Sequence, residues 1–172
     1  MDDKILACID PRGNTGAVID WAAWAAVRTG APLEFLHVLE RHPERAEATD
    51  LSGAIGLGAQ ESLLQQLSDE DAARSVAQRE EGRQLLTYAR ERAKAAGASR
   101  LDARLRHGDF VDTAVELQAG VALYVLGEHH HASGPGRWRA DHHLEQVVRR
   151  VSAPVLVATT ASFTAPQLAV LA

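Results

Sequence analysis

The chain has 172 residues, of which 46% are hydrophobic and 24% charged, and this is enough material to bury the core of a single domain. Its net charge of −5 argues against a general affinity for nucleic acid or an anionic membrane, because both favour a basic surface. No apolar stretch approaches the roughly 20 residues that span a bilayer, and "MDDKILACID" lacks the pattern of a signal peptide. We therefore expect a cytoplasmic protein, and the single cysteine, Cys8, which cannot form an internal disulfide, agrees with a reducing compartment.

Short apolar runs alternate along the chain with longer segments of helical spacing, which is the pattern of parallel strands joined by helices. The first predicted strand, residues 5–9, stops at "DPRGN", where Asn14 or Thr15 can cap a helix. Gly30 is the expected end of that helix, and "APLEFLHVLE", residues 31–40, predicts the second strand.

The same alternation continues in the second half of the chain. Helical spacing returns at Leu63 and runs to a stop at Gly97, with Ser68 or Asp69 as the expected start of the main helix. "LDARLRHG", which starts at Leu101, alternates apolar and charged residues, as a strand with one wet face or at a sheet edge does. A short helix, "VALYVLG", a last helix and "APVLVAT" follow in that order. The predicted fold is therefore α/β, an open doubly wound sheet of five strands with right-handed crossovers.

Four segments in this order and spacing resemble a known family: "ILACIDPRGNTGAVIDWAAWAA", "FLHVLE", "RHGDFVDTAVELQAGVALYVLG" and "LEQVVRRVSAPVLVA". The family is that of the universal stress proteins, and the resemblance covers about residues 4 to 160. It implies the strand order 3-2-1-4-5. The alternating strand at Leu101 would then lie at one edge of the sheet, where its own pattern independently places it.

The resemblance also bears on domains and partners. The segment of residues 41–67 resembles the first half of bacterial universal stress proteins that carry two such domains in tandem. We therefore expect one domain over residues 1–160 and a tail, residues 161–172, that resembles the lead-in strand of a missing second domain. The predicted fifth strand is apolar without alternation, so something should cover or extend its edge. Family members commonly dimerise along this strand, and we expect a homodimer through this edge and the tail.

Ligands of an open parallel sheet sit at the carboxyl ends of the strands where the winding reverses, here between the first and fourth strands. The loops after Asp10 and Gly127 should border this crevice. In nucleotide-binding family members the second loop reads Gly-x2-Gly-x9-Gly-Ser/Thr, which brings backbone amides to the phosphates. The resemblance implies that Asp10 and Val38 take the positions that hold adenosine and that Gly127 is the first glycine of the loop.

The rest of the phosphate loop departs from the family pattern. His130 stands at the second glycine. Aligned backwards from "LEQVVRR", the third glycine falls on Asp141 and the Ser/Thr on His142, one residue later than the x9 spacing gives. A carboxylate at the start of a helix repels phosphate and caps the amides that phosphate needs. The expected function is a non-catalytic, stress-associated binding or regulatory domain that does not bind ATP in the family mode. The alternative is an ATP-binding member with an altered loop and slow ATP hydrolysis, as in some relatives.

Five of the eight histidines lie in residues 126–150, and three interpretations of them stay open. They form a solvated loop, a pH-responsive or anion-binding site, or a divalent-metal site. Zinc requires three or four ligands that converge at about 2 Å, which composition alone does not establish. The candidate metal ligands are His129, His131, His142 and His143.

Three further residues have a structural interpretation beside a functional one. Asp10 either caps the first helix through the turn or orients a ribose or base. His37 is expected to be a hydrogen-bonded residue of the sheet rather than a ligand. Cys8 is expected to be a small buried hydrophobe.

Overall fold

The structure, a computed structural model, describes residues 3–11, 13–40, 57–127, 142–159 and 163–164. Five parallel strands form one sheet in the order β3-β2-β1-β4-β5, which confirms the predicted α/β class and strand order. The strands are β1 (Lys4–Cys8), β2 (Leu33–Leu39), β3 (Leu101–His107), β4 (Val121–Gly127) and β5 (Val155–Ala158).

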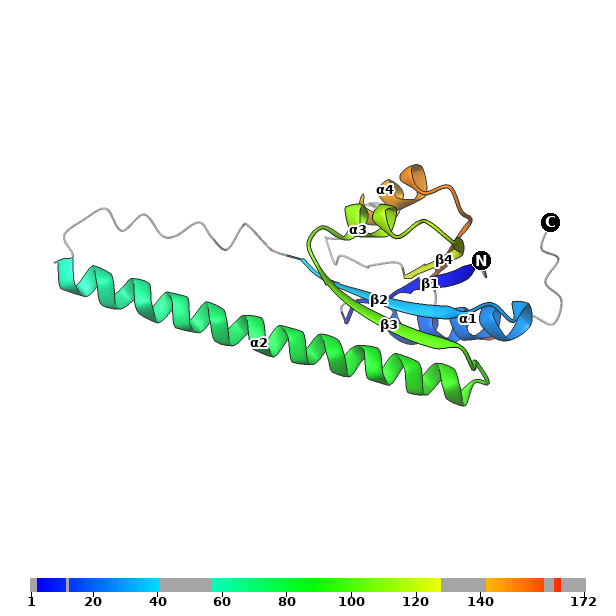
Figure 1. The fold of residues 1–172 in the computed structure, drawn as a ribbon, viewed down its shortest axis with the longest axis horizontal. Coiled ribbons are helices and arrows are strands. Elements are labelled where there is room, and N and C mark those ends of the chain that lie inside the picture. The colour runs from blue at the N-terminus through cyan, green and yellow to red at the C-terminus, as the bar shows by residue number, and fades with distance from the viewer. Residues whose placement is uncertain (1–2, 12, 41–56, 128–141, 160–162, 165–172) are drawn as a thin grey trace, which may run out of the picture.

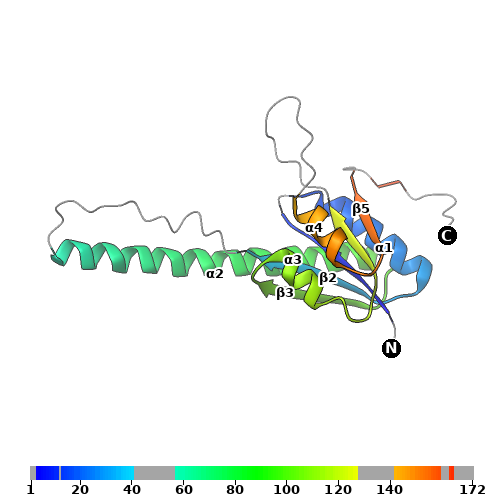
Figure 2. The ribbon, with the colours of Figure 1, turned by 90° about the horizontal axis from the view of Figure 1, so that it is seen from above.

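Helices cover both faces of the sheet, as Figures 1 and 2 show. They are α1 (Thr15–Thr29), α2 (Leu57–Ala95), α3 (Phe110–Glu116) and α4 (His142–Arg150). The helices α1 and α2 lie on one face, and α3 and α4 lie on the other, so the fold is doubly wound. Among the described helices, none combines the length and the apolar character that crossing a bilayer requires.

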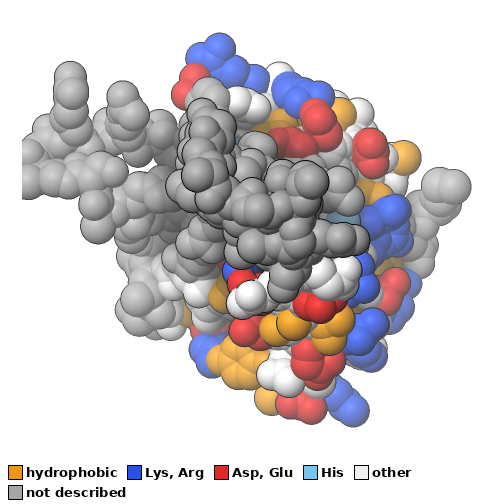
Figure 3. Space-filling model, turned by 90° about the vertical axis from the view of Figure 1, so that its left-hand side faces the viewer, with side chains coloured by type: hydrophobic (Ala, Val, Ile, Leu, Met, Phe, Trp, Pro, Cys, Tyr) orange, Lys and Arg blue, Asp and Glu red, His pale blue; other side chains and the backbone are white. Residues whose placement is uncertain are grey.

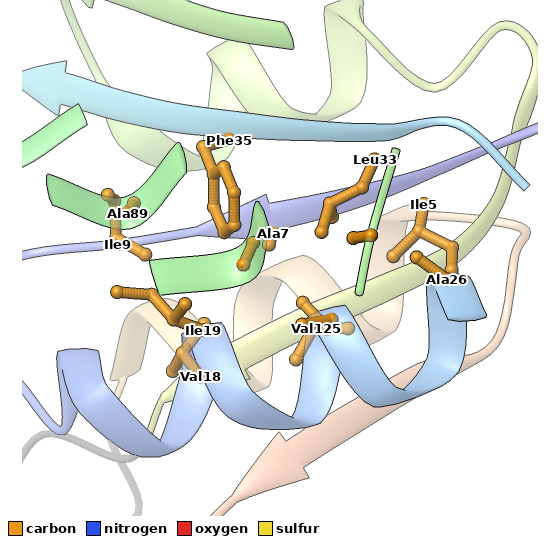
Figure 4. Close-up of a cluster of buried hydrophobic side chains, with 14 of the residues drawn as sticks. Ile5, Ala7, Ile9, Val18, Ile19, Ala26, Leu33, Phe35, Ala89 and Val125 are labelled. Atoms are coloured by element: carbon orange, nitrogen blue, oxygen red, sulfur yellow. The ribbon is translucent and has the colours of Figure 1, made fainter. Parts of the chain in front are cut away.

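The larger core lies between the sheet and the pair α1 and α2 (Figure 4). Phe35 of β2 and Val125 of β4 are fully buried there, against Val18 and Ile19 of α1. Most other helix residues of this core are alanines, which let the helix backbones approach the sheet closely. The fully or almost fully buried alanines are Ala17, Ala22, Ala23, Ala25, Ala26, Ala89 and Ala93.

A second core fills the face covered by α3 and α4. Tyr124 of β4 is completely buried in it, and its hydroxyl donates to the carbonyl oxygen of Ala114 in α3 at 2.9 Å. Cys8 lies in the same core with 7% of its surface exposed, which confirms the predicted buried hydrophobe. Burial, assisted by the charge of Glu34, raises the pKa of the Cys8 thiol to about 12, so the thiol stays protonated.

The ends of α1 follow the sequence signals. Asn14 is the N-cap residue, although its side chain makes no capping hydrogen bond. Gly30 is the C-cap in the left-handed conformation, with φ of 70°, and its N–H donates to the carbonyl oxygen of Ala26. This confirms Gly30 as the predicted end of the helix, because glycine adopts a positive φ without steric cost.

The predicted start of the main helix at Ser68 or Asp69 is wrong. The helix α2 begins at Leu57 and passes through both residues, whose side chains are exposed. Serine and aspartate favour helix caps because their side chains compete for backbone groups, but here Asp69 accepts instead from the Gln65 side chain at 3.1 Å. The helix therefore continues, and its amino-terminal half extends beyond the sheet (Figures 1 and 2).

A paired charge fastens the carboxyl-terminal half of α2 to α1. Arg92 donates from Nε and Nη2 to the two carboxylate oxygens of Asp20, both at 2.7 Å. Such a two-pronged contact fixes the orientation of both side chains. Ala89 and Ala93, in the same two turns as Arg92, are buried. With Arg92 bound to Asp20 and these alanines buried, α2 is held in one rotational position over the sheet.

The strand β3 lies at the sheet edge, as its alternating pattern predicts. Its charged side adjoins a buried carboxylate, Glu34 of β2, which is 4% exposed. Lys4 Nζ of β1 lies 2.5 Å from one Glu34 oxygen, and Arg104 Nε of β3 lies 2.6 Å from the other. The Arg104 contact acts through charge, since its direction is not that of a hydrogen bond. One carboxylate thus ties three strands together.

We predict that Glu34→Gln lowers the free energy of unfolding by about 2 kcal/mol, because two cations lose their buried partner. The loss stays below that of a fully buried pair, since Lys4 and Arg104 are 23% and 37% exposed. Urea unfolding measures the change, with the exposed Glu116→Gln as the control. Equal stability of the two variants would show that the three-strand ion pair contributes nothing.

Candidate functional site

The carboxyl ends of the strands meet at one edge of the sheet, on the side of the molecule toward which α2 projects (Figure 1). Figure 3 views the molecule from that side. On the described surface at this end, acidic and basic side chains are interspersed. A pocket of about 500 Å³ opens here over the ends of β1 and β2 and against α2. Its described lining residues are Asp10, Pro11, His37, Val38, Leu39, Glu40, Gln78, Glu81, Gly82, Gln84, Leu85 and Tyr88. The structure therefore brings Asp10 and Val38 together in one pocket.

The pocket opens where β1 separates from β2. Ile9 N still donates to the carbonyl oxygen of Leu36 at 2.9 Å, but the carbonyl oxygen of Ile9 accepts from a side chain, His37 Nδ1, at 2.9 Å. This bond confirms His37 as a hydrogen-bonded residue of the sheet. In a parallel ladder, alternate residues direct their main-chain groups to the same side. The N–H and C=O of Val38 therefore point, like those of Leu36, to the side of β1, where the pocket begins.

Asp10 organises the turn that follows β1. Its carbonyl oxygen accepts from Gly13 N at 3.0 Å and from Thr15 Oγ1 at 2.5 Å. The cap residue of α1 is Asn14, and the main chain of Asp10 contributes to the helix start through these two bonds. That arrangement is a turn closing onto a helix, and it holds Asp10 at the pocket wall.

Gly127 ends β4 beside the start of α1. A Cβ at this position would lie 2.9 Å from Cγ2 of Val18 and 3.7 Å from the backbone nitrogen of Asn14. The end of β4 at Gly127 therefore lies beside the start of α1, as the strand order predicts, and the loop after Gly127 lies outside the described residues. The packing of α1 requires a glycine at Gly127, so its presence needs no phosphate to explain it.

We predict that Gly127→Ala lowers the free energy of unfolding by about 1–3 kcal/mol, because the new methyl group overlaps Val18. Adding Val18→Ala should recover part of this loss, which a double-mutant cycle from urea unfolding measures. Gly16→Ala is the control, since nothing lies within 4 Å of its ideal Cβ. A loss at Gly127 that Val18→Ala does not reduce would contradict the packing explanation.

An acidic side chain that the sequence pattern does not reveal lies between the starts of α3 and α4. Oε1 of Glu40, the residue after β2, accepts from Phe110 N at 3.2 Å and lies 3.9 Å from Nδ1 of His143. The start of α3 carries a second carboxylate, because Asp109 is its N-cap and accepts from Asp112 N at 2.8 Å. The only signal in the sequence was the position of Glu40 directly after a strand.

The histidine clusters are only partly within the described structure. His129, His130, His131 and Asp141 lie outside the described residues, and His142 is the first residue of α4. His143, whose side chain is 46% exposed, lies near Glu40. No group of three or more histidine, cysteine, aspartate or glutamate side chains among the described residues is arranged to hold a metal ion. The metal site at His129, His131, His142 and His143 stays a prediction.

An open doubly wound sheet with a crevice at its carboxyl edge defines a class of small ligand-binding α/β domains. Within this class, the sequence model of the universal stress protein family matches residues 1–159 of the chain. The chain belongs to the universal stress protein family.

Relatives and solved structures agree with this assignment. A universal stress protein of Synechocystis sp. is 26% identical over 155 residues, which are 90% of this chain and 54% of the relative. The chain thus spans about half the length of that relative. A universal stress protein in complex with cAMP is 22% identical with a TM-score of 0.56, covering 90% of this chain and 94% of its own. One from Archaeoglobus fulgidus in complex with dAMP is 16% identical with a TM-score of 0.54, covering 91% and 97%.

Proposed function

We propose that this chain is a non-catalytic, stress-associated regulatory domain whose crevice does not bind ATP in the family mode. The observation that carries the proposal is the Glu40 carboxylate, held between the starts of α3 and α4 by Phe110 N. A nucleotide phosphate near the start of α4 would meet this negative charge. Coulomb repulsion between like charges a few ångströms apart is strong where water is partly excluded.

The sequence of the loop supports the same proposal. His130, Asp141 and His142 replace the residues that bring backbone amides to phosphate in nucleotide-binding members. Gly127 is kept, but its contact distance to Val18 gives it a packing role. The cAMP and dAMP complexes of two relatives keep nucleotide binding as the alternative to be tested. For that alternative, Asp10 and Val38 would hold the nucleoside.

We predict that ATP with magnesium leaves the unfolding midpoint of the wild-type protein unchanged. Tight binding to the native state would instead stabilise it by about 2.7 kcal/mol at a hundredfold excess over the dissociation constant. Thermal unfolding with and without 5 mM ligand measures this, at roughly a hundredfold excess for a dissociation constant of about 50 μM. A clear upward shift that Val38→Pro or Asp10→Ala abolishes would establish the alternative.

We further propose a homodimer through the edge of β5, extended by the C-terminal tail. The two sheet edges differ in chemistry. The β3 edge carries Asp102 and Arg106, exposed charges of the kind that prevent edge pairing, whereas β5 is the uncharged segment "VLVA". Residues 155–157 of β5 are only half-buried in the single chain. A partner strand would complete their burial and their backbone hydrogen bonding.

We predict a dimer in light scattering coupled to size exclusion, and a shift toward monomer in Val157→Lys. A lysine on an edge strand opposes pairing because the partner strand would bury its charge. Arg106→Glu, on the opposite edge, should keep the wild-type mass. A monomeric wild-type protein, or dissociation by Arg106→Glu alone, would exclude the β5 interface.

The remaining proposals concern domain organisation and location. Residues 1–160 would form one universal stress domain, and residues 161–172 the lead-in to a second one. The half-length match to the Synechocystis relative supports this division. The ring of Phe163, beyond β5, lies edge-on to Trp21 of α1 with centroids 4.9 Å apart, so this residue packs on α1. A cytoplasmic location is proposed from the sequence.

A further inference from the structure

We infer that the pocket at the carboxyl edge binds a linear polyamine, a flexible chain that carries several amino groups. This inference rests on the proposed function, because it assigns a ligand class to the same crevice. It depends on three features of the pocket wall: a histidine nitrogen that accepts, a set of carboxylates and an aromatic ring.

The buried histidine presents a hydrogen-bond acceptor. Nδ1 of His37 faces the carbonyl oxygen of Ile9, which can only accept, so Nδ1 carries the proton. In the neutral ring, Nε2 is then an acceptor. His37 is 6% exposed and lines the pocket, and the hydrogen bond that the described structure shows for its ring is the one between Nδ1 and Ile9. An imidazole nitrogen that accepts at the pocket wall favours a ligand that donates.

The space beside this imidazole depends on Gly82 of α2. A Cβ at Gly82 would lie 3.0 Å from Cδ2 and 3.5 Å from Nε2 of His37, and 2.9 Å from Cδ1 of Leu105. Glycine in a helix interior is unfavourable by about 0.5–1 kcal/mol relative to alanine. Its presence here keeps the ring edge that carries Nε2 clear of a side chain.

Carboxylates supply the charge that selects a cation. Asp10, Glu40 and Glu81 line the pocket, and the described lining contains no lysine or arginine. Glu40 is held in place by its bond from Phe110 N at 3.2 Å. A group with positive charge would be attracted to these carboxylates, whereas a phosphate would be repelled.

Tyr88 adds an aromatic ring to the same wall. Its hydroxyl accepts from Arg92 Nη1 at 3.0 Å, and Arg92 is itself fixed by Asp20, so the ring is held in one orientation. Ammonium groups are attracted to the faces of such rings, by about 0.5–1 kcal/mol at exposed sites. The ring therefore favours the same ligand class as the carboxylates.

The distribution of the acidic groups distinguishes a polyamine from a metal ion. The three carboxylates come from the turn after β1, the end of β2 and the middle of α2, around a pocket of about 500 Å³. No described group of three acidic, histidine or cysteine side chains converges on one point as a metal requires. A chain with amino groups at intervals can reach separated carboxylates, which a single ion cannot.

The test is isothermal titration of the full chain with spermidine, at low and at physiological salt. We expect the double variant Glu40→Gln/Glu81→Gln to bind spermidine about tenfold more weakly than wild type. The matched control is Glu91→Gln/Glu116→Gln, which changes the net charge equally at two exposed positions outside the pocket lining. It should bind as wild type does. Urea unfolding confirms that both double variants are folded.

Two outcomes would overturn the inference. Equal weakening in both double variants would mean that spermidine follows the net charge of the protein rather than this pocket. An absence of spermidine binding would also refute it while leaving the proposed function intact. Titration of wild type with ATP and magnesium in the same series separates the two proposals, because ATP binding refutes the proposed function whatever spermidine does.

Discussion

The close approach of α1 to the sheet is the constraint on which the rest of this domain depends. The helix lies against β1 and β4 because its facing residues are mostly alanines and because Gly127 leaves room for Val18. Leucines at the same positions would push the helix outward, since protein interiors are packed without spare volume. The turn after β1 is then held between the strand end and the helix start by the carbonyl oxygen of Asp10. The position of the pocket wall is thus set by packing between α1 and the sheet, which does not itself line the pocket.

Packing and polar contacts also position the other side of the pocket. The helix α2 approaches β2 and β3 through Gly82, and Arg92 pairs with Asp20 to fix how the helix is turned. His37 takes over the hydrogen bond to Ile9 at the point where β1 and β2 separate. Each of these contacts joins residues that are far apart in the chain. Together they produce a pocket from the ends of two strands and one helix, without any special local motif.

The difference between local patterns and contacts of residues far apart in the chain explains what could be predicted from the sequence. The strands were predictable because burial on both faces requires a continuous apolar run, as in "VALYVLG". Burial on one face requires alternation, as in the strand at Leu101. Asp10 and Val38 were found through the family resemblance, and the structure places them in one pocket. Glu40, Gly82 and Tyr88 were not found, because their roles arise only when α2 and α3 come to rest beside β2. The start of α2 was misplaced because exposed Ser68 and Asp69 resemble caps but have no packing role that would reveal the longer helix.

The length of α2 gives the pocket a mechanical property. The helix has 39 residues and is therefore about 58 Å long, yet only its carboxyl-terminal half packs on the sheet. Gln78, Glu81 and Tyr88 form the α2 side of the pocket, opposite walls built into the sheet. This side and the projecting half belong to one continuous helix. A contact that displaced the projecting half would therefore act on the pocket as well, and the Arg92–Asp20 ion pair would oppose it.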